Sequence, residues 1–408
     1  MSELSKRRSA KKTHPIYAAA VKLRPELVKW RRHLHMYPEP SMQEHETAAY
    51  VAERLREIGI EDVRTGVGET GVVGLVRGAK KRAKTVALRA DMDALEMTEE
   101  TGASYASRKP GLMHACGHDG HTACLLGAAA ILQGMRSRLP GNVKLVFQPG
   151  EEGPGGALKM INDGVLQNPK VASIAAVHVM GDLPSGHIGI NRGYMLAQTD
   201  SITLTIIGAS AHAARPHLGV DSIAVAAQAL IAVQQFVARH TDPIDRRLVT
   251  FGIIEGGTRS NILAPQVRLV GTIRTLEPKS REAILKFLKK DLGKLVAAMG
   301  AKLRVEHEEG YPPLRNDDGV MDALQAAATD CLGAGRVDPL GEPSLGGEDF
   351  AYFVQAGVAA GLARLGTRDE AKGFTSSVHQ VDFDFDDGVV LPAGAAVLVQ
   401  TAVNMLSD

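Results

Sequence analysis

The spacing of hydrophobic and polar positions predicts an amphipathic helix within residues 41–59. Ser41 and Glu44 have the spacing of a capping box, in which two side chains accept backbone N–H groups at the start of a helix. Apolar residues then recur every three or four positions, and Gly59 stands where helices commonly end. We therefore expect Ser41 and Glu44 to cap this helix.

Runs rich in valine and leucine alternate with further helical patterns. The expected strands are residues 71–78, 85–91, 142–148 and 173–180, and the expected helices are residues 122–135 and 156–163. Alternating strands and helices predict an α/β fold, with a mostly parallel sheet and helices on both faces. Ligand sites in such sheets gather at the carboxyl ends of strands. The polar residues at or near these ends are Asp91, Glu151, Glu152 and His178.

The pattern changes after residue 200. The expected elements are a strand at 201–207, a helix at 221–240, strands at 247–254 and 266–276, a helix at 280–299 and a strand at 301–309. This β-α-β-β-α-β order is typical of a ferredoxin-like α+β domain. We predict that residues 198–310 form such a domain, inserted into a discontinuous domain of residues 1–197 and 311–408.

Composition narrows the class of protein. The 408 residues are 44% hydrophobic and 23% charged, and the formal net charge is +1, which argues against nucleic acid or an anionic membrane as a partner. Three cysteines are too few for a disulfide framework, so we expect a reducing, cytoplasmic location. No continuous apolar run follows the basic residues at 6–12, so no secretory signal is expected, and no run has the length of a membrane span.

Residues 113–121, MHACGHDGH, contain a high density of metal-binding side chains. Cys116 and His118 stand among three further residues of this kind, in a chain with only 14 histidines and 3 cysteines. Two glycines permit an irregular backbone on which neighbouring side chains converge. We interpret this segment as one part of a metal site that other segments complete.

Candidate ligands on loops or strand ends of the same predicted sheet would complete the site. They are Cys116, His118, Glu152, His178 and His379. One thiolate, three imidazoles and a carboxylate suit Zn, Mn, Co or Ni, whereas Mg and Ca prefer oxygen ligands. Taken singly, His178 and His379 also fit hydrogen-bonded core histidines, so the prediction depends on their convergence. Residues expected to support the ligands instead of binding an ion are Asp91, Asp93, Asp119 and His121.

Glu151 and Glu152 follow a rigid Pro-Gly turn at the end of a predicted strand. Two adjacent carboxylates in such a place are often only a solvated turn. A hydrolytic metal site, however, needs one carboxylate to bind an ion and an unligated one to take a proton from water. The pair could therefore supply both a ligand and a general base.

These segments and several others resemble the metal-dependent amidohydrolase and metallopeptidase family of aminoacylases, hippurate hydrolases, carboxypeptidases and indole-acetyl-amino-acid hydrolases. The resemblance rests on MHACGHDGH, FQPGEEGPGGA, AAVHV, GASAHAARPHLGVD, GGTRSNILAP, GGEDFAYF and the C-terminal His379 with FDFDD and LPAGAAVL. The segments occur in the family's order from about residue 30 to the C-terminus. Together they are specific, although each alone would be weak.

The resemblance implies two divalent metal ions bound by the five candidate ligands, with Glu151 as general acid and base. It implies that the inserted domain is a lid and dimerisation domain, so we expect a homo-oligomer, a dimer or tetramer. His212 of the lid would polarise the scissile carbonyl, in its own or a partner's active site. Asn261 and Arg274 would bind the carboxylate of the substrate.

Two positions depart from the family pattern. Ser210-Ala211 stands where relatives often carry glycines before the lid histidine, and Gln380-Val381 follows His379 where Ser-Pro is common. These changes concern the flexibility of the lid loop and the shape of the acyl pocket. Neither removes a candidate ligand.

The expected activity is hydrolysis of the amide bond of a small N-acyl amino acid. The main alternative is a dipeptidase or carboxypeptidase acting on small peptides. A second alternative is a thiol hydrolase with Cys116 as nucleophile, whose activity would survive removal of metal by a chelator. A third is a non-catalytic metal-binding relative, which would need no unligated base such as Glu151. The sequence does not distinguish among acyl groups or among the four metals.

Overall fold

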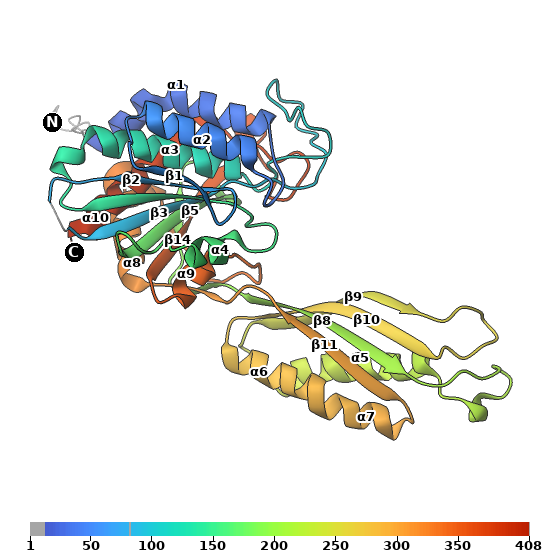
Figure 1. Ribbon diagram of the computed structural model, residues 1–408. Helices are drawn as coiled ribbons and strands as arrows, with labels where there is room; N and C mark the ends of the chain where they lie inside the picture. The colour runs from blue at the N-terminus through green and yellow to red at the C-terminus, as the bar shows by residue number, and fades with distance from the viewer. Residues whose placement is uncertain (1–12, 81–82, 408) are drawn as a thin grey trace, which may run out of the picture. The chain divides into compact units, whose positions relative to one another are not determined.

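The computed structural model describes residues 13–80 and 83–407, which form two compact units (Figure 1). Unit 1 comprises Met1–Gly193, Asn316–Gly341 and Phe353–Asp408, and unit 2 comprises Tyr194–Arg315 and Glu342–Tyr352. Each unit has its own sheet and its own cluster of buried hydrophobic side chains. The basic segment at residues 6–12 lies outside the described residues.

Unit 1 is built on an eight-stranded sheet in the order β1-β2-β4-β3-β5-β14-β6-β13. The strands are β1 (Val63–Val67), β2 (Gly71–Val76), β3 (Thr85–Asp91), β4 (Asn142–Gln148), β5 (Val171–Pro184), β6 (Ile188–Ile190), β13 (Val337–Pro339) and β14 (Ala359–Arg368). The four central strands are parallel, and β3 and β14 are almost entirely buried. Their continuous apolar runs are explained by burial on both faces of the sheet.

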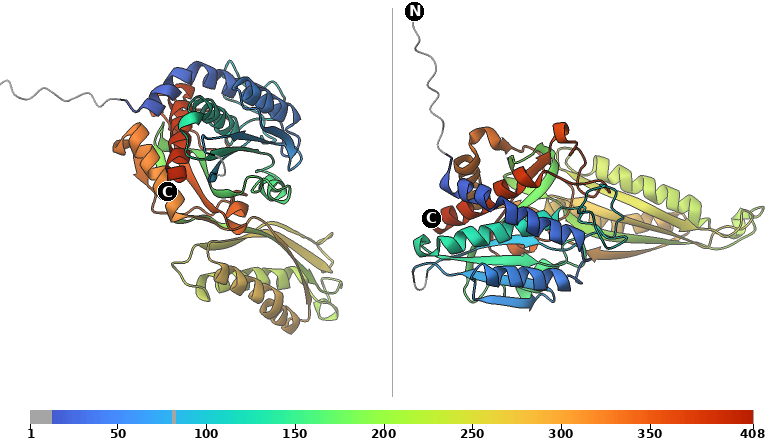
Figure 2. Two further views of the ribbon diagram at one scale, coloured as in Figure 1. Left: turned by 60° about the vertical axis from the view of Figure 1, so that its left-hand side comes forward. Right: turned by 90° about the horizontal axis from the view of Figure 1, so that it is seen from above.

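Helices cover this sheet, and the longest of them pack together. They are α1 (Pro15–Met36), α2 (His45–Glu57), α3 (His118–Gly134), α4 (Gly156–Asn162), α8 (Asp318–Leu332), α9 (Ala351–Gln355) and α10 (Asp387–Ser407). Figures 1 and 2 show α1, α3 and α10 side by side as one layer, and α4 lies across the strands from α3. The predicted α/β fold with a mostly parallel sheet is confirmed.

Unit 2 has a four-stranded antiparallel sheet in the order β11-β8-β10-β9. Its elements are β8 (Gln198–Ile207), α5 (Ser222–Arg239), β9 (Arg247–Gly256), β10 (Gln266–Thr275), α6 (Pro278–Lys286), α7 (Leu292–Ala298) and β11 (Lys302–Glu309), with a π-helical turn, Phe287–Asp291, joining α6 to α7. The short strands β7 (Gly193–Leu196) and β12 (Leu314–Asn316) pair where the chain leaves and returns to unit 1. This topology is the predicted ferredoxin-like one.

The predicted capping box is wrong. Helix α2 begins at His45, and the backbone N–H groups of Glu46 and Thr47 in its first turn donate to the carboxylate of Glu39, at 3.1 and 2.8 Å. The Ser41 hydroxyl donates instead to Asp93, and Glu44 accepts from backbone groups outside the helix. Both residues therefore serve loops of unit 1 that are distant in sequence.

Within residues 13–80 and 83–407, two helices, α5 and α10, have the length and composition of a membrane span, so the expectation that no run has this length is wrong. In α10, 78% of the apolar window is buried inside the protein, as expected for a core helix, but in α5 only 28% is buried. Packing within the described residues therefore leaves isoleucines of α5 exposed.

Candidate active site

A sharp turn joins the loop of Cys116 to α3. Gly117 has a φ of 78°, and a Cβ atom at this position would lie 2.4 Å from Cγ2 of Val179 in β5. Only glycine meets both conditions without strain, and α3 begins at the next residue, His118. The turn therefore brings two predicted ligands, Cys116 and His118, to the start of α3.

The five predicted ligands come together in unit 1. Sγ of Cys116 lies 3.3 Å from Nε2 of His379 and 3.5 Å from Nε2 of His178. Nε2 of His379 lies 3.0 Å from a carboxylate oxygen of Glu152, and ligand atoms of Glu152 and His118 lie within 4.8 Å of each other. Side chains from four separate segments thus have the spacing of ligands around metal ions. Their binding of metal stays a prediction.

The hydrogen bonds of two histidines favour metal binding. Nδ1 of His178 lies 2.7 Å from the Val179 carbonyl oxygen, and Nδ1 of His118 lies 2.9 Å from that of Asp93. A carbonyl oxygen only accepts, so each Nδ1 carries a proton and each Nε2 is left for another partner. Nε2 of His118 is buried and has no hydrogen-bond partner among the described residues. The residues present therefore fit a bound cation.

The charges around the site also fit a cation. Burial disfavours a charged His118, but Asp91 and Asp93 raise its pKa to about 10 in the metal-free protein. Burial, together with Glu152 and Glu151, raises the pKa of the Cys116 thiol well above its ordinary value. Binding of a metal ion would therefore release protons from these side chains. The raised pKa also argues against Cys116 as a nucleophile without metal, since that role needs a lowered pKa.

The backbone of His379 is strained. Its φ of 64° lies in the left-handed region, which residues other than glycine seldom adopt, and its N–H donates to the carbonyl of Ala115 at 2.8 Å. This hydrogen bond ties the C-terminal loop to the loop of Cys116. Such strain is often found at functional sites, where the surrounding structure holds it.

Asp93 binds the backbone of the turn that carries Glu151 and Glu152. Its two carboxylate oxygens accept the backbone N–H groups of Glu151, at 3.1 Å, and of Glu152, at 2.9 Å. Ser41 donates to it at 2.6 Å. Burial would raise the pKa of Asp93, but the hydrogen bond from His118 and those from its other partners lower it overall. Asp93 is therefore a charged acceptor that fixes the turn carrying Glu151 and Glu152.

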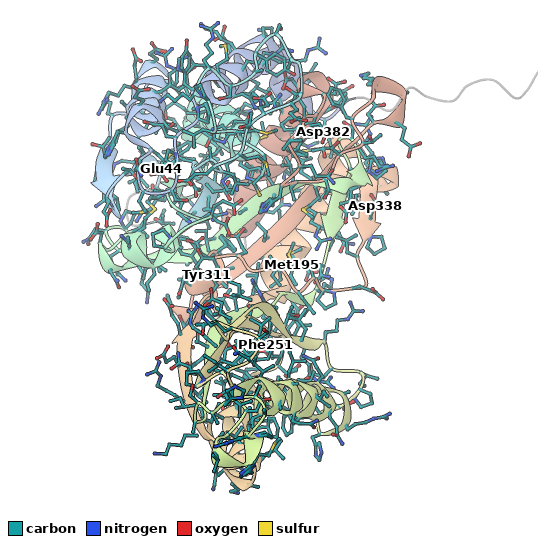
Figure 3. The ribbon with its side chains drawn as sticks, turned by 90° about the vertical axis from the view of Figure 1, so that its right-hand side faces the viewer. Glu44, Met195, Phe251, Tyr311, Asp338 and Asp382 are labelled. Atoms are coloured by element: carbon teal, nitrogen blue, oxygen red, sulfur yellow. The ribbon has the colours of Figure 1, made fainter. Side chains whose placement is uncertain are left out.

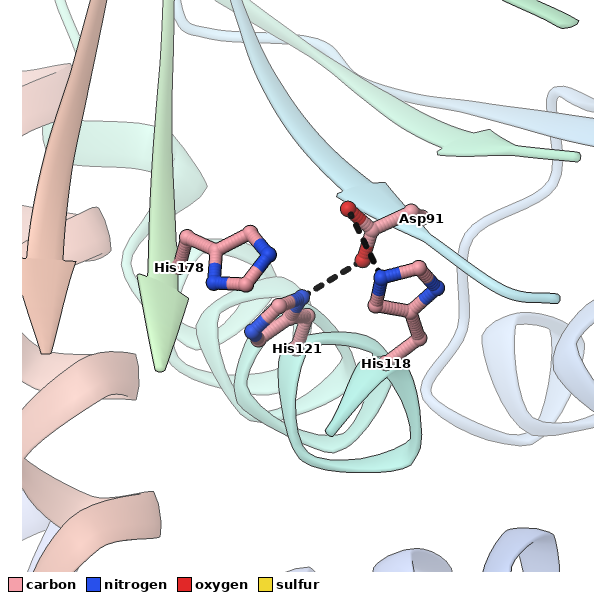
Figure 4. Close-up of side chains that lie close together, drawn as sticks. All are labelled: Asp91, His118, His121 and His178. Atoms are coloured by element: carbon pink, nitrogen blue, oxygen red, sulfur yellow. Dashed lines mark hydrogen bonds and ion pairs between the residues drawn. The ribbon is translucent and has the colours of Figure 1, made fainter. Parts of the chain in front are cut away.

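Asp91 and His121 lie beside the predicted ligands His118 and His178 (Figure 4). Nε2 of His121 accepts the N–H of Val179 at 2.8 Å, so its Nδ1 carries the proton and donates to Asp91 at 2.5 Å. Both nitrogens of His121 are engaged, which leaves it no lone pair for a metal. The other carboxylate oxygen of Asp91 accepts from Arg89 at 2.6 Å and lies 3.7 Å from Nε2 of His118.

Sequence reasoning missed a buried charged network next to the site. Nε of Arg31 and Nδ1 of His35, both on α1, lie 2.8 and 2.7 Å from one oxygen of Asp119, the residue after His118. Arg31 also contacts Asp384 and Asp387, at 2.7 and 2.9 Å, and is fully buried. The available signal was an arginine and a histidine spaced four apart on the apolar face of a helix.

Two residues predicted to bind substrate, His212 and Asn261, are neighbours in unit 2. The N–H of Ala214 donates to Nδ1 of His212 at 3.0 Å, so the proton of a neutral His212 is on Nε2, for which the described residues offer no acceptor. The N–H of Ala213 donates to the carbonyl of Asn261 at 3.0 Å. Both side chains are exposed, in loops that extend the β8–β10 ladder.

Arg274, the third residue predicted to bind substrate, lies at the other end of the β8–β10 ladder. Along β10, Gln266 pairs with Ile207 and Arg274 pairs with Thr199, near the point where the chain enters unit 2. At about 3.4 Å per residue, roughly 25 Å of strand separates Arg274 from the loops of His212. Its guanidinium is half-buried, which lowers its pKa, and it makes no hydrogen bond or ion pair within the described residues.

Comparisons with known proteins identify the family. Residues 87–404 match the model of peptidase family M20/M25/M40. N-acetyl-L-cysteine deacetylase of Bacillus subtilis is 37% identical over 386 residues, 95% of this chain and 89% of that protein. Thermostable carboxypeptidase 1 of Saccharolobus solfataricus is 36% identical over 368 residues, 89% of this chain and 91% of that protein.

A solved structure shows the same likeness over nearly the whole chain. The YXEP protein of Bacillus subtilis, described as a dinuclear metal-binding peptidase of the M20 family, superposes with a TM-score of 0.81 at 31% identity. The match covers 95% of this chain and 99% of that one. The family resemblance seen in the sequence is thereby confirmed. The chain belongs to peptidase family M20/M25/M40 and is a metal-dependent hydrolase that acts on amide or peptide bonds.

Proposed function

We propose that this enzyme hydrolyses the amide bond of small N-acyl amino acids, using two divalent ions of Zn, Mn, Co or Ni. The observation that carries the proposal is the division of labour between two adjacent carboxylates. Glu152 meets His379 and groups with Cys116, whereas Glu151 lies outside that group and has His118, Glu348 and Asp349 within 4.8 Å. The Bacillus relative named as a deacetylase of N-acetyl-L-cysteine supports this substrate class.

Five side chains would bind the two ions, namely Cys116, His118, Glu152, His178 and His379. When bound, the ions supply Lewis acidity and lower the pKa of a coordinated water to roughly 7. Glu151, with only 6% of its surface exposed, takes the proton from the attacking water and passes it to the departing amine nitrogen. His212 donates its Nε2 proton to the substrate carbonyl oxygen as negative charge develops there. Arg274 binds the substrate carboxylate.

The direct test is Glu151→Gln. The amide has the same shape but cannot take a proton, so we expect normal metal content and a loss of kcat of about 10²- to 10⁴-fold. The measurements are metal analysis and hydrolysis of an N-acyl amino acid panel by apoprotein reloaded with Zn, Mn, Co or Ni. Glu57→Gln, on α2, is the matched control. Full activity of the Glu151 variant would exclude the assignment.

The same panel separates the alternatives. Faster turnover of dipeptides than of N-acyl amino acids would favour a dipeptidase or carboxypeptidase, which the Saccharolobus relative supports by its name. Activity that survives chelation would favour a Cys116 nucleophile. No hydrolysis of any member with both metals bound would favour a non-catalytic metal-binding protein.

The separation of His212 from Arg274 supports a shared active site. A small N-acyl amino acid is much shorter than roughly 25 Å, so two residues at opposite ends of one β8–β10 ladder cannot both touch it. We therefore assign Arg274 to the active site of its own chain, and His212 and Asn261 to that of a partner chain. The enzyme would then be a homo-oligomer, with a dimer as its smallest active form.

Exposed apolar residues in unit 2 support a dimer. Strand β9 is an edge of its sheet, and its Ile253 and Ile254 are 48% and 63% exposed. On α5, Ile223 and Ile231 are 50% and 55% exposed. An unpaired edge strand with apolar side chains is a template for pairing with another chain. We propose that this surface binds a second copy of the chain, with β9 of one copy pairing with β9 of the other. We also propose that the enzyme is located in the cytoplasm.

Mixing two inactive variants tests the shared site. In a mixed dimer of His212→Ala and Glu151→Gln chains, one active site combines an intact Glu151 with an intact partner His212. Random mixing should therefore restore about a quarter of wild-type activity. No recovery, although mixed dimers are detected by mass spectrometry, would place His212 in the active site of its own chain.

A further inference from the structure

Glu44 is buried against the turn that carries Glu151 and Glu152. Its side chain is fully buried in unit 1 (Figure 3) and comes from the segment that precedes α2. One carboxylate oxygen accepts the backbone N–H of Gly150 at 2.8 Å and that of Met42 at 2.9 Å. The other oxygen accepts the hydroxyl of Thr70 at 2.5 Å. Glu44 thus links three segments that are distant in sequence.

The hydrogen bond to Gly150 completes a continuous set. The N–H groups of Gly150, Glu151 and Glu152 are consecutive, and each donates to a buried carboxylate, the first to Glu44 and the next two to Asp93. The direction of both glutamate side chains depends on how this short stretch of backbone is held. Asp93 and Glu44 therefore act on the turn from its two ends.

Close packing leaves this turn little freedom. Gly150 has a φ of 61°, and a Cβ atom there would lie 2.4 Å from Sδ of Met42. Met42 itself has a φ of 64°, which is unfavourable for a residue with a side chain. The carboxylate of Glu44 accepts the N–H of this same strained residue. Segment 41–44 therefore packs closely against the turn, and the carboxylate of Glu44 accepts hydrogen bonds from both Met42 and Gly150.

We propose that Glu44 is a positioning residue, which orients Glu151 for proton transfer and Glu152 for metal binding through the backbone N–H of Gly150. This inference rests on the proposed function for its kinetic consequence. Its structural consequence, the direction of Glu152, is independent of substrate.

Three substitutions separate the hydrogen bond from the charge. In Glu44→Gln, the amide oxygen can still accept from Gly150 and Met42, while the NH₂ group can donate to Thr70. Glu44→Asp keeps the charge but is one methylene too short to reach Gly150, and Glu44→Ala removes the acceptor. Partners beyond the ligands typically change activity or metal affinity by about 10- to 100-fold. We expect that loss of kcat in the Asp and Ala variants and near-normal kcat in the Gln variant.

Glu39→Ala is the matched control. Glu39 is also a buried residue of the segment before α2, but among the described residues its carboxylate accepts only the N–H groups of Glu46 and Thr47 at the start of that helix. Its loss should lower the melting temperature as much as Glu44→Ala does, with kcat unchanged. An equal loss of kcat in both variants would show that Glu44 acts only through the overall stability of unit 1, and would overturn the proposal.

The second measurement needs no substrate. Apoprotein is titrated with Co²⁺, and the visible absorption spectrum and the dissociation constant are recorded for each variant. A displaced Glu152 should shift the spectrum and weaken binding in Glu44→Asp and Glu44→Ala, but not in Glu44→Gln or Glu39→Ala. If Glu44→Ala does not fold, the Asp and Gln pair decides. Identical spectra in that pair would overturn the proposal, whereas a panel without turnover would count only against the proposed function.

Discussion

The two units hold their functional side chains in opposite ways. In unit 1 the predicted ligands and their partners are buried or half-buried, apart from His379, whose side chain is 51% exposed, and most of their polar atoms have a partner within the same unit. In unit 2, His212 and Asn261 are exposed, and the guanidinium of Arg274 makes no hydrogen bond or ion pair within the described residues. Substitutions in unit 1 should therefore affect metal binding and stability, whereas those in unit 2 should affect catalysis alone.

Arg31→Ala should have the largest effect on stability. It removes the buried cation that Asp119, Asp384 and Asp387 share, and breaking a buried ion pair typically costs about 3–5 kcal/mol. The free energy of unfolding is measured by urea denaturation. The neighbouring Arg32 contacts Asp387 but is 43% exposed, so Arg32→Ala should cost no more than about 1 kcal/mol. Equal losses would contradict the special role of the buried arginine.

His212→Ala should lower kcat by about 10²- to 10³-fold, the usual cost of removing one donor to a developing oxyanion. Because His212 is exposed and lies in unit 2, metal content and melting temperature should not change. Steady-state kinetics, metal analysis and thermal denaturation check these expectations. His217→Ala, in the same loop, should behave as wild type. Loss of metal from the His212 variant would break the contrast between the two units.

Arg274→Ala should mainly raise KM, by about 10- to 100-fold, because a hydrogen bond to a charged group contributes about 1.5–3 kcal/mol. Stability should stay the same or rise slightly, since a half-buried cation without an ion pair is removed. Arg268→Ala, on the same strand, removes only a surface ion pair with Glu255 and should leave KM unchanged. The assignment fails if KM is the same for substrates with and without a carboxylate.

The smallest effect concerns pH. Burial would lower the pKa of His35, but Asp119 and Glu99 raise it to about 9, above its ordinary value of 6.5. The stabilisation from charged His35 is therefore complete below pH 6.5 and is lost as pH rises through about 9. Unfolding free energy should fall over this range in the wild type and less steeply in His35→Gln. Parallel curves for the two proteins would show that His35 does not cause the fall.

Local patterns predicted much of the fold for a simple reason. The burial of strands β3 and β4 on both faces leaves runs rich in apolar residues, and the alternation along β8 marks a sheet with one covered face. These signals need only neighbouring residues. They give the β-α-β-β-α-β order of unit 2. That order predicts the fold, because a short run of such elements has few ways to pack.

The residues at helix starts show where local reasoning ends. Ser41 and Glu44 have the spacing of a capping box, but Glu39 serves the N–H groups of α2, while Ser41 and Glu44 serve Asp93 and Gly150. A carboxylate or hydroxyl can accept or donate to many groups, so its type and spacing do not select a partner. The same holds for Arg31, whose partners are distant in the chain.

The amino-acid sequence by itself determined most of the elements and the family, and it supplied the candidate ligands, because these depend on residue type, periodicity and order along the chain. Only the tertiary structure decided which side chains meet. It brought Cys116 to His178 and His379, and it engaged both nitrogens of His121. It also showed that one strand pair separates His212 from Arg274. The physical reason is that hydrogen bonds and metal coordination depend on distances of a few ångströms between segments far apart in sequence.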